Sequence, residues 1–192
     1  ITVDDTAPTC AYGFKTVADP FVGKLSFIKV LSGKLSATSN VINARTGQPE
    51  RMGKTLIVCG KKQTDTAAIT TGDIGVVSKL ATAKTGDTLC DARKVFFMPP
   101  IPFPEPCYSV AITPKTKGQE DKIAAGLIRL NEEDLTFNWV NNAETRQMVV
   151  SGTGDMQMDV ILSRLKSRFG VDAELSEPRV PYREKIRKKV EV

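Results

Sequence analysis

The chain has 192 residues, a length that accommodates one large domain or two domains of about 90 to 100 residues each. It contains no histidine, which excludes a His-based triad and a Cys–His nucleophile pair and removes the commonest metal ligand. The net charge of +5 comes from residues 1–100, with 13 Lys or Arg and 8 Asp or Glu, because residues 101–192 hold 14 of each; this is mild evidence for a polyanionic partner.

Two further features concern the compartment and the ends of the chain. No apolar run approaches the ~18 residues of a membrane-spanning helix and no signal peptide is present, so a cytoplasmic protein without a membrane partner is expected. The four cysteines (Cys10, Cys59, Cys90 and Cys107) form no CxxC pair, which argues against a zinc site and fits a reducing cytosol. Since Ile1 is not an initiator Met, a fragment of a longer protein is expected.

Residues 1–97 are predicted to form an all-β domain. Short β-rich runs alternate with turn signals, and no convincing helical period occurs. The predicted strands are 14–18, 25–31, 39–43, 55–59 and 74–80. Two Thr-Gly-Asp turns recur, at 71–73 and 85–87. Runs spaced near ten residues apart indicate a small antiparallel barrel or sandwich.

Gly53-Lys54-Thr55 resembles the end of a phosphate-binding P-loop. That loop requires GxxxxGK[ST] between a strand and a helix, so that backbone amides surround the phosphate. Position 48 is Gln, and a β-branched run follows instead of a helix. The pattern therefore favours a turn that leads into a strand.

Residues 98–106 form a proline-rich stretch, Met98-Pro-Pro-Ile-Pro-Phe-Pro-Glu-Pro106. Five of these nine residues are proline, and each fixes its own φ, removes a backbone donor and extends the residue before it. The stretch is predicted to be a semi-rigid linker between two domains. The alternative is a stiff surface loop within one domain.

Residues 107–178 carry alternating strand and helix signals. The predicted order is a strand at 108–112, a helix at 118–134, a hairpin of 135–140 with 147–151, a second helix, and a strand at 171–175. This β-α-β-β-α-β order is typical of a ferredoxin-like α+β domain. The turn Gly152-x-Gly154 precedes the second helix, where Asp155 would repel an anion, so a tight turn is favoured over an anion site.

The second helix has a clear apolar face. Met158, Ile161, Leu162, Leu165 and Phe169 recur at i, i+3, i+4, i+7 and i+11, and the following Gly170 is predicted to cap the helix. This spacing predicts that Leu162 and Leu165 are equally buried. The adjacent carboxylates of residues 132–134 are expected on a solvated helix end rather than at a metal.

Residues 179–192 are expected to begin a further domain. Tyr182, Ile186, Val190 and Val192 share one parity, as in a half-buried strand, although no partner strand follows. The basic residues between them are interpreted as the solvated face of that strand.

Four strings in this order resemble one family: FKTVADPFVGKLSFIKVLSGKL (14–35), TGDTLCD (85–91), FPEPCYSVAITPKTKGQEDK (103–122) and SGTGDMQMDVILSRLKSRFGV (151–171). They resemble the second and third domains of bacterial elongation factor G, the translocation GTPase. RVPYREK (179–185) resembles the first strand of its fourth domain. The resemblance implies a translation-factor β-barrel followed by a ferredoxin-like domain, in agreement with the interpretation above.

The resemblance also implies a role. In such factors the barrel packs on an upstream GTPase domain and touches small-subunit ribosomal RNA, while the third domain relays the nucleotide state to the ribosome. GTP and Mg²⁺ would bind only in that upstream domain, so no cofactor, metal or catalytic site is expected in this chain, and the partners would be the ribosome and the parent protein's own GTPase domain. A monomer is expected.

Site residues follow from the matched motifs. The resemblance implies that the barrel residues near the GTPase and RNA faces are Asp19, Pro20, Phe21, Gly23 and Lys24. It implies a hinge at Pro104, Glu105 and Pro106. It further implies an interdomain, ribosome-facing cleft, where fusidic-acid-type inhibitors bind in the family, lined by Thr136, Phe137, Gly152, Gly154, Asp155 and Gln157.

The sequence departs from the family at two places. GTGDMQMD stands where GMGELHLE is usual, so Gln157 replaces a typical His, and Leu135 replaces a usual Pro. These departures leave open the alternative that the chain comes from a paralogous translational GTPase, including a ribosomal-protection (tetracycline-resistance) relative. A stand-alone RNA-binding module also explains the charge, but it leaves the ordered motifs unexplained. No motif in the sequence supports a third class, an enzyme with its own active site.

Overall fold

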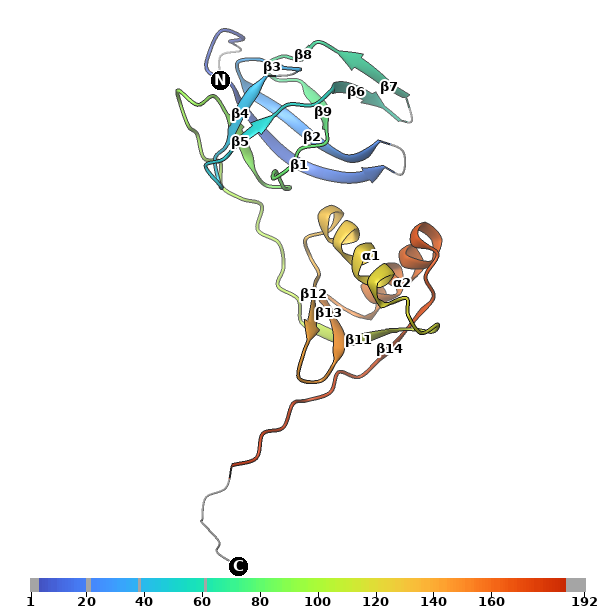
Figure 1. Cartoon of the computed structure of the whole chain (residues 1–192). Helices are drawn as coiled ribbons and strands as arrows, with labels where there is room; N and C mark the ends of the chain where they lie inside the picture. Colours follow the sequence, from blue (N-terminus) through green and yellow to red (C-terminus); the bar gives the residue numbers. More distant parts are fainter. Residues whose placement is uncertain (1–3, 20–21, 38, 61, 186–192) are drawn as a thin grey trace, which may run out of the picture. The chain divides into compact units, whose positions relative to one another are not determined.

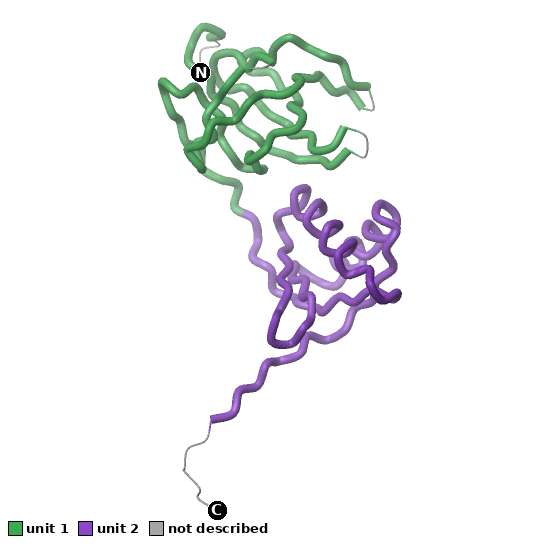
Figure 2. Tube along the Cα trace, in the orientation of Figure 1, with its two compact units in different colours: residues 1–102 green, residues 103–192 purple. Residues whose placement is uncertain are grey.

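The computed structural model describes residues 4–19, 22–37, 39–60 and 62–185. The chain divides into two compact units, residues 1–102 and 103–192, coloured separately in Figure 2. The division lies after Pro102, inside the proline-rich stretch. Each unit has its own core.

The described part of the first unit is all β (Figure 1). Its main sheet has eight antiparallel strands in the order β5-β4-β10-β1-β2-β9-β6-β7, and a two-stranded sheet pairs β3 with β8. The strands are β1(Cys10–Asp19), β2(Gly23–Ser32), β3(Leu35–Ser36), β4(Asn40–Asn43), β5(Pro49–Arg51), β6(Thr55–Cys59), β7(Lys62–Thr66), β8(Ala68–Ile69), β9(Ile74–Ser78) and β10(Thr88–Cys90).

A buried carboxylate links distant parts of this sheet. Glu50 of β5 is only 2% exposed and accepts hydrogen bonds from the Thr82 amide at 3.0 and 3.2 Å and from the Thr82 hydroxyl at 2.5 Å. β5 stands at one end of the strand order, whereas Thr82 follows β9 on the other side of β1 and β2. The sheet therefore curls back on itself, and the first unit is a β-barrel.

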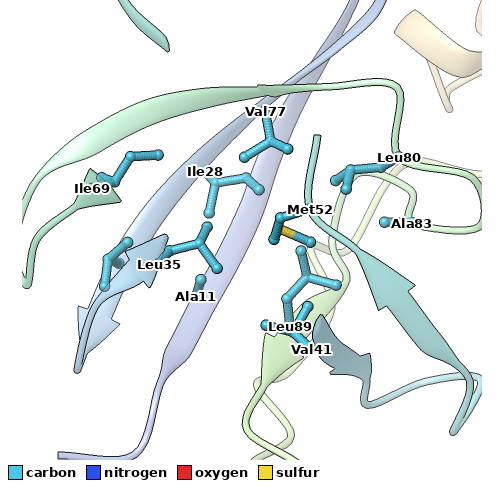
Figure 3. Packing of buried hydrophobic residues seen from close by; sticks show 11 residues of the cluster. Ala11, Ile28, Leu35, Val41, Met52, Ile69, Val77, Leu80, Ala83 and Leu89 are labelled. Atoms are coloured by element: carbon cyan, nitrogen blue, oxygen red, sulfur yellow. The ribbon is translucent and has the colours of Figure 1, made fainter. Parts of the chain in front are cut away.

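The barrel interior is filled by alternate residues of the strands (Figure 3). Ile28 and Val30 of β2 point into it, while Leu25 and Phe27 point to the opposite face and pack in a second cluster. β9 contributes to both clusters, through Val77 and Val76 respectively. The nearly continuous apolar run of β9 thus reflects burial on both faces. The interior cluster is Ala11, Ile28, Val30, Leu35, Val41, Met52, Ile69, Val77, Leu80, Ala83 and Leu89.

Residues 103–185, the described part of the second unit, form one antiparallel sheet and two helices. Its elements are β11(Tyr108–Pro114), α1(Glu120–Glu133), β12(Asn138–Asn142), β13(Gln147–Gly152), α2(Asp155–Phe169) and β14(Ala173–Ser176). The strand order is β12-β13-β11-β14. In the order of the chain this is 2-3-1-4, the arrangement of a split βαβ, so the predicted ferredoxin-like fold is confirmed.

Both helices of this unit lie on one face of the sheet (Figure 1). Gly126 of α1 permits a close helix–helix approach, because a Cβ there would lie 2.5 Å from Leu165 Cδ2 of α2. Gly170 ends α2 in the left-handed region at φ +64° and donates its N–H to the Leu165 and Lys166 carbonyls, as predicted. The apolar face of α2 is confirmed for Met158, Ile161 and Leu165, whereas Leu162 is only half-buried at the edge of the core.

Three sequence predictions need correction. The hairpin strand β12 begins at Asn138 rather than at Leu135, because the Thr136 amide and hydroxyl both donate to Asp134 Oδ1 and hold a turn there. Residues 132–134 are not simply a solvated end, since Glu133 forms ion pairs with Arg168 at 3.0 Å and Arg164 at 3.7 Å.

The tail gives the third correction. Its described part, 179–185, forms no strand, and Tyr182 is 90% exposed instead of half-buried. A strand needs a partner to satisfy its backbone groups, and none is paired with this segment among the described residues. The rest of the predicted strand, residues 186–192, lies outside the described residues.

Candidate functional site

The connection between β1 and β2 carries the barrel residues that the family motif singles out. Asp19 Oδ1 accepts the Val22 amide at 2.8 Å, which closes the turn, and Gly23 adopts φ +87° as β2 begins. Lys24 Nζ donates to the Ala83 carbonyl at 2.8 Å, and the Lys24 carbonyl accepts the Lys79 amide at 3.0 Å. Lys24, at the start of β2, is thereby fixed to the segment that follows β9. Pro20 and Phe21 lie outside the described residues.

An ion pair between a buried carboxylate and a partly exposed arginine lies at the turn before β10, which the sequence predicted only as a Thr-Gly-Asp turn. The Asp87 side chain, 4% exposed, accepts Arg45 Nε at 2.6 Å, Arg45 Nη2 at 2.9 Å, Asn43 Nδ2 at 2.9 Å and the Lys84 amide at 2.8 Å. Burial by itself raises the pKa of Asp87, but the hydrogen bonds from Arg45, the Lys84 amide and Asn43, with the Arg45 charge, outweigh it and leave the pKa below its ordinary value.

Residues 91–99, the strap, connect β10 with the proline-rich stretch and include its first two residues, Met98 and Pro99. The Met98 amide donates to Thr88 Oγ1 at 3.1 Å, and the Tyr12 hydroxyl donates to the Pro99 carbonyl at 3.3 Å. The strap is therefore attached to the outer side of β1 and β10, and the predicted linker is anchored to the barrel up to Pro99.

The other end of the proline-rich stretch is anchored to the second unit. The Cys107 amide donates to the Gly152 carbonyl at 2.9 Å. Between these two anchors, the hinge residues Pro104 and Glu105 are exposed, Pro106 is half-buried, and all three lie outside helices and strands.

A polar cluster in the second unit centres on Gln157. Its Oε1 accepts the Thr153 amide at 2.8 Å and the Thr153 hydroxyl at 3.1 Å. Its Nε2 donates to Thr136 Oγ1 at 2.6 Å and to Asp134 Oδ2 at 3.1 Å. One side chain thus joins the turn after α1 to the turn before α2, so the two helices are linked at this end of the domain.

Asp134 is the charged member of this cluster. Burial by itself raises the pKa of Asp134, but hydrogen bonds from the Thr136 hydroxyl and amide and from Gln157, with the Arg164 charge, leave the pKa below its ordinary value. The carboxylate therefore stays ionised at neutral pH and orients the Thr136 and Gln157 side chains.

The remaining residues of the predicted cleft differ in what they can contact. The Phe137 ring is 2% exposed in the core of its own domain, so it is not available to a ligand or a neighbouring domain in this structure. Gly152 is buried, and a Cβ there would lie 2.3 Å from Gln157 Oε1. Gly154 precedes α2 with open space around it, and Asp155 is exposed in the first turn. Of the residues predicted for this cleft, Thr136, Gly154, Asp155 and Gln157 are thus at least partly exposed, whereas Phe137 and Gly152 are buried.

Three other features are absent from the described residues: a metal-binding cluster, a phosphate-binding loop and a membrane-spanning helix. They contain no group of three or more Cys, Asp or Glu that could hold a metal ion. Gly53 and Lys54 lead into β6, and a Cβ on Gly53 would lie 2.3 Å from the Ser78 carbonyl oxygen, so this glycine serves close strand packing. No helix in the described ranges is long and apolar enough to cross a membrane.

The fold and these contacts define a class of protein: an antiparallel β-barrel that is followed, after a proline-rich segment, by a ferredoxin-like domain. Comparison with known families identifies both parts. Residues 8–92 match the family described as Elongation factor G domain 2, and residues 103–177 match Elongation Factor G, domain III. The chain therefore belongs to the elongation factor G family, as its second domain followed by its third.

A solved structure agrees with this assignment of the fold. The chain is similar to a crystal structure of a protein from Thermus thermophilus, with a TM-score of 0.78 and 27% sequence identity over 92% of this chain. The chain spans 27% of the length of that structure.

Proposed function

We propose that this chain acts as the second and third domains of a ribosomal translocation GTPase. In this proposal the barrel docks on a GTPase domain and on small-subunit ribosomal RNA, and the ferredoxin-like domain relays the GTP state to the ribosome during movement of tRNA and mRNA. The observation that carries the proposal is the succession of two family matches, 8–92 and 103–177, in the order of elongation factor G.

The barrel contacts support a docking role for the β1–β2 hairpin. The Asp19 and Lys24 side chains, at the end of β1 and the start of β2, are held by hydrogen bonds, so these two side chains lose little conformational entropy on binding. The excess of cations in residues 1–100 suits a partner rich in phosphate.

The Gln157 cluster supports the relay role of the second unit. Because Gln157, in α2, bonds both Thr153 before α2 and residues of the turn after α1, a force on the start of α2 is passed to that turn through hydrogen bonds. A relay requires such an element to move as one body, with the change absorbed at a hinge.

A domain exchange tests the proposal directly. The second and third domains of a full-length bacterial elongation factor G are replaced by residues 8–177 of this chain, and single-turnover translocation on ribosomes is measured. We expect translocation well above that of the GTPase domain alone. A chimera that binds ribosomes and hydrolyses GTP but does not move mRNA would contradict the proposal.

The same chimera separates two paralogous roles. A ribosomal-protection factor removes tetracycline from the ribosome, so the chimera is also assayed for tetracycline release. Release without translocation would assign the chain to that branch instead.

A salt titration tests the stand-alone alternative. Weak binding of the isolated chain to small subunits is expected, with a log–log salt slope of roughly −0.9 per phosphate neutralised on duplex RNA and less on single strands. Tight binding that is independent of salt would favour a stand-alone RNA-binding module.

Calorimetry with GTP and Mg²⁺ tests the expectation that nucleotide binds elsewhere in the parent protein. No binding to this chain is expected, because the Gly53 turn leads into a strand rather than a helix. Micromolar affinity, about −8 kcal/mol, would overturn this expectation.

A further inference from the structure

Two cysteines of the barrel face each other across adjacent strands. Cys10 of β1 and Cys90 of β10 are direct partners in the antiparallel register, followed by the pairs Ala11 with Leu89 and Tyr12 with Thr88. Residues directly opposite in such a ladder project from the same face of the sheet. Neither cysteine is in a disulfide, and the Cys90 thiol donates to the Ile42 carbonyl of β4 at 3.5 Å, a contact that a bond to Cys10 would replace.

The hydrogen bonds on either side show which kind of pair this is. The Asp91 amide donates to the Thr9 carbonyl at 3.0 Å, and the Gly13 amide donates to the Asp87 carbonyl at 3.0 Å. Hydrogen-bonded and non-hydrogen-bonded pairs alternate along an antiparallel ladder, so Cys10 and Cys90 form a non-hydrogen-bonded pair. The Cα atoms of such pairs are about 4.5 Å apart, inside the range of about 4.4 to 6.8 Å that disulfides span.

The surroundings keep the two thiols away from solvent. Cys10 is 5% exposed and Cys90 is 0% exposed, although both project from the face opposite Ala11 and Leu89 of the barrel interior. On this outer face the strap is attached to Tyr12 and Thr88, the next residues along each strand on the same side. Burial, followed by the proximity of Cys90, raises the pKa of the Cys10 thiol, so a reactive thiolate is scarce in the folded barrel.

We propose that Cys10 and Cys90 are a disulfide site, at which thiol–disulfide exchange forms a cross-strand bond that fixes β1 to β10 beneath the strap. A thiolate of the pair attacks a small-molecule disulfide such as oxidised glutathione, forming a mixed disulfide and releasing one reduced glutathione. The second thiol loses its proton and attacks the protein sulfur of the mixed disulfide, which releases the second glutathione. Two protein S–H bonds and the S–S bond of oxidised glutathione break, and the protein S–S bond and the two S–H bonds of reduced glutathione form.

The test measures the equilibrium amount of disulfide rather than its rate of formation, so slow exchange at the buried thiols does not affect the result. The exposed cysteines are first removed as Cys59→Ser and Cys107→Ser. This variant is equilibrated in glutathione redox buffers, once folded and once in denaturing urea, and the Cys10–Cys90 bond is quantified by mass spectrometry of peptides under non-reducing conditions. We expect the effective concentration of one thiol at the other to be at least tenfold higher in the folded chain than in the urea-unfolded chain.

Two controls complete the experiment. Cys10→Ser in the same background gives no intramolecular disulfide, and the oxidised form with both cysteines has a thermal midpoint above that of the reduced form. An effective concentration that is equal or lower in the folded chain, or an oxidised form that melts earlier, overturns the proposal. Either result would mean that the pair serves only as small apolar residues.

Discussion

At the scale of single residues, the Gln157 cluster shows how a small departure in sequence is accommodated. The Gln157 side chain uses both ends of its amide at once, since Oε1 accepts from Thr153 and Nε2 donates to Thr136 and Asp134. The space it needs is provided by Gly152, the position where a Cβ would come within 2.3 Å of its Oε1 and 2.4 Å of Met158 Cε. Gly152 and Gln157 therefore act as a pair.

The change Gly152→Ala tests this pairing. The methyl group displaces the Gln157 amide, and breaking part of the cluster together with overpacking is expected to destabilise the second unit by about 1 to 3 kcal/mol. Urea unfolding followed by the fluorescence of Trp139, the single tryptophan, which packs on this core, measures the effect.

Gly154→Ser is the matched control, because the space around Gly154 is open and its φ of 172° is extended backbone. Serine at this position before α2 is a favourable helix cap, so a neutral or slightly stabilising result is expected. Equal losses from both changes would show that the turn, and not the Gln157 contact, requires glycine.

The buried carboxylate of Asp87 predicts an acid-sensitive barrel. Its pKa is lowered in the fold, so its contribution to stability is present above the unfolded pKa, near 3.8, and is lost as the pH falls through the folded value. Asp87→Asn should therefore cost about 1 to 3 kcal/mol at pH 7, and the difference from the wild type should shrink below about pH 4.

Calorimetry of both proteins from pH 7 to pH 2 measures this difference. Asp65→Asn is the control, since its ion pair with Lys54 is exposed, with side chains 70% and 75% exposed. Surface pairs contribute little, so this variant should follow the wild type at every pH. A constant difference for Asp87→Asn across the range would exclude its ionisation as the cause.

At the scale of elements, two leucines of helix α2 differ in burial, although their spacing in the sequence predicts the same burial for both. Leu165 is fully buried beside Gly126, whereas Leu162 is half-buried at the edge of the core. Leu165→Ala is expected to destabilise the second unit by about 2 to 5 kcal/mol.

Leu162→Ala should cost clearly less, about 1 kcal/mol, because solvent already reaches this side chain and less apolar surface is uncovered. Denaturation midpoints of the two variants, read from Trp139 fluorescence, decide between them. Similar losses of stability in the two variants would show that both leucines are equally buried, as the spacing alone predicts.

Most of the fold could be predicted because its long elements carry local patterns. The apolar face of α2, the Gly170 cap and the apolar strands β2 and β9 follow from residue spacing within one segment. The strands β3, β5, β7, β8 and β10 were missed. β10 has three residues and exists because it pairs with Cys10–Tyr12, far earlier in the chain, which no local pattern reveals.

The candidate site was predicted less completely for the same physical reason. Gln157 stood out as a departure from the family motif, but its partner Asp134 is 23 positions away and was interpreted as part of a solvated end. Phe137 was expected at a cleft, whereas its ring fills the core and only its carbonyl is used, as the acceptor of Asn131 Nδ2. Burial and long-range hydrogen bonds are properties of the folded chain, so spacing alone could not assign them.

At the scale of the whole molecule, the proline-rich stretch determines how independently the two units can behave. Tyr12 and Thr88 fix the strap as far as Pro99, and Cys107 is fixed by the Gly152 carbonyl. Residues 100–106 make no hydrogen bond to the described residues of either unit. We therefore propose that the prolines stiffen the segment between the anchors and that the pivots lie near Pro99 and Cys107.

The last prediction concerns the stiffness of this segment. Polyproline geometry extends by about 3.1 Å per residue, whereas a glycine-containing chain behaves as a flexible coil. Replacing Pro100, Pro102 and Pro104 by glycine should therefore shorten the mean distance between the units and broaden its distribution. Single-molecule energy transfer between dyes on Cys59 and on a Ser167→Cys variant, with Cys107→Ser, measures both quantities.

Pro181→Gly in the exposed tail serves as the control, since it lies outside the segment between the anchors and should leave the distribution unchanged. If the proposed function holds, the glycine variant should also weaken translocation by the chimera more than its GTP hydrolysis, because a relay through a flexible coil transmits less displacement. An unchanged distance distribution in the glycine variant would show that something other than the prolines holds the units apart, and the hinge would then have to be sought elsewhere in the chain.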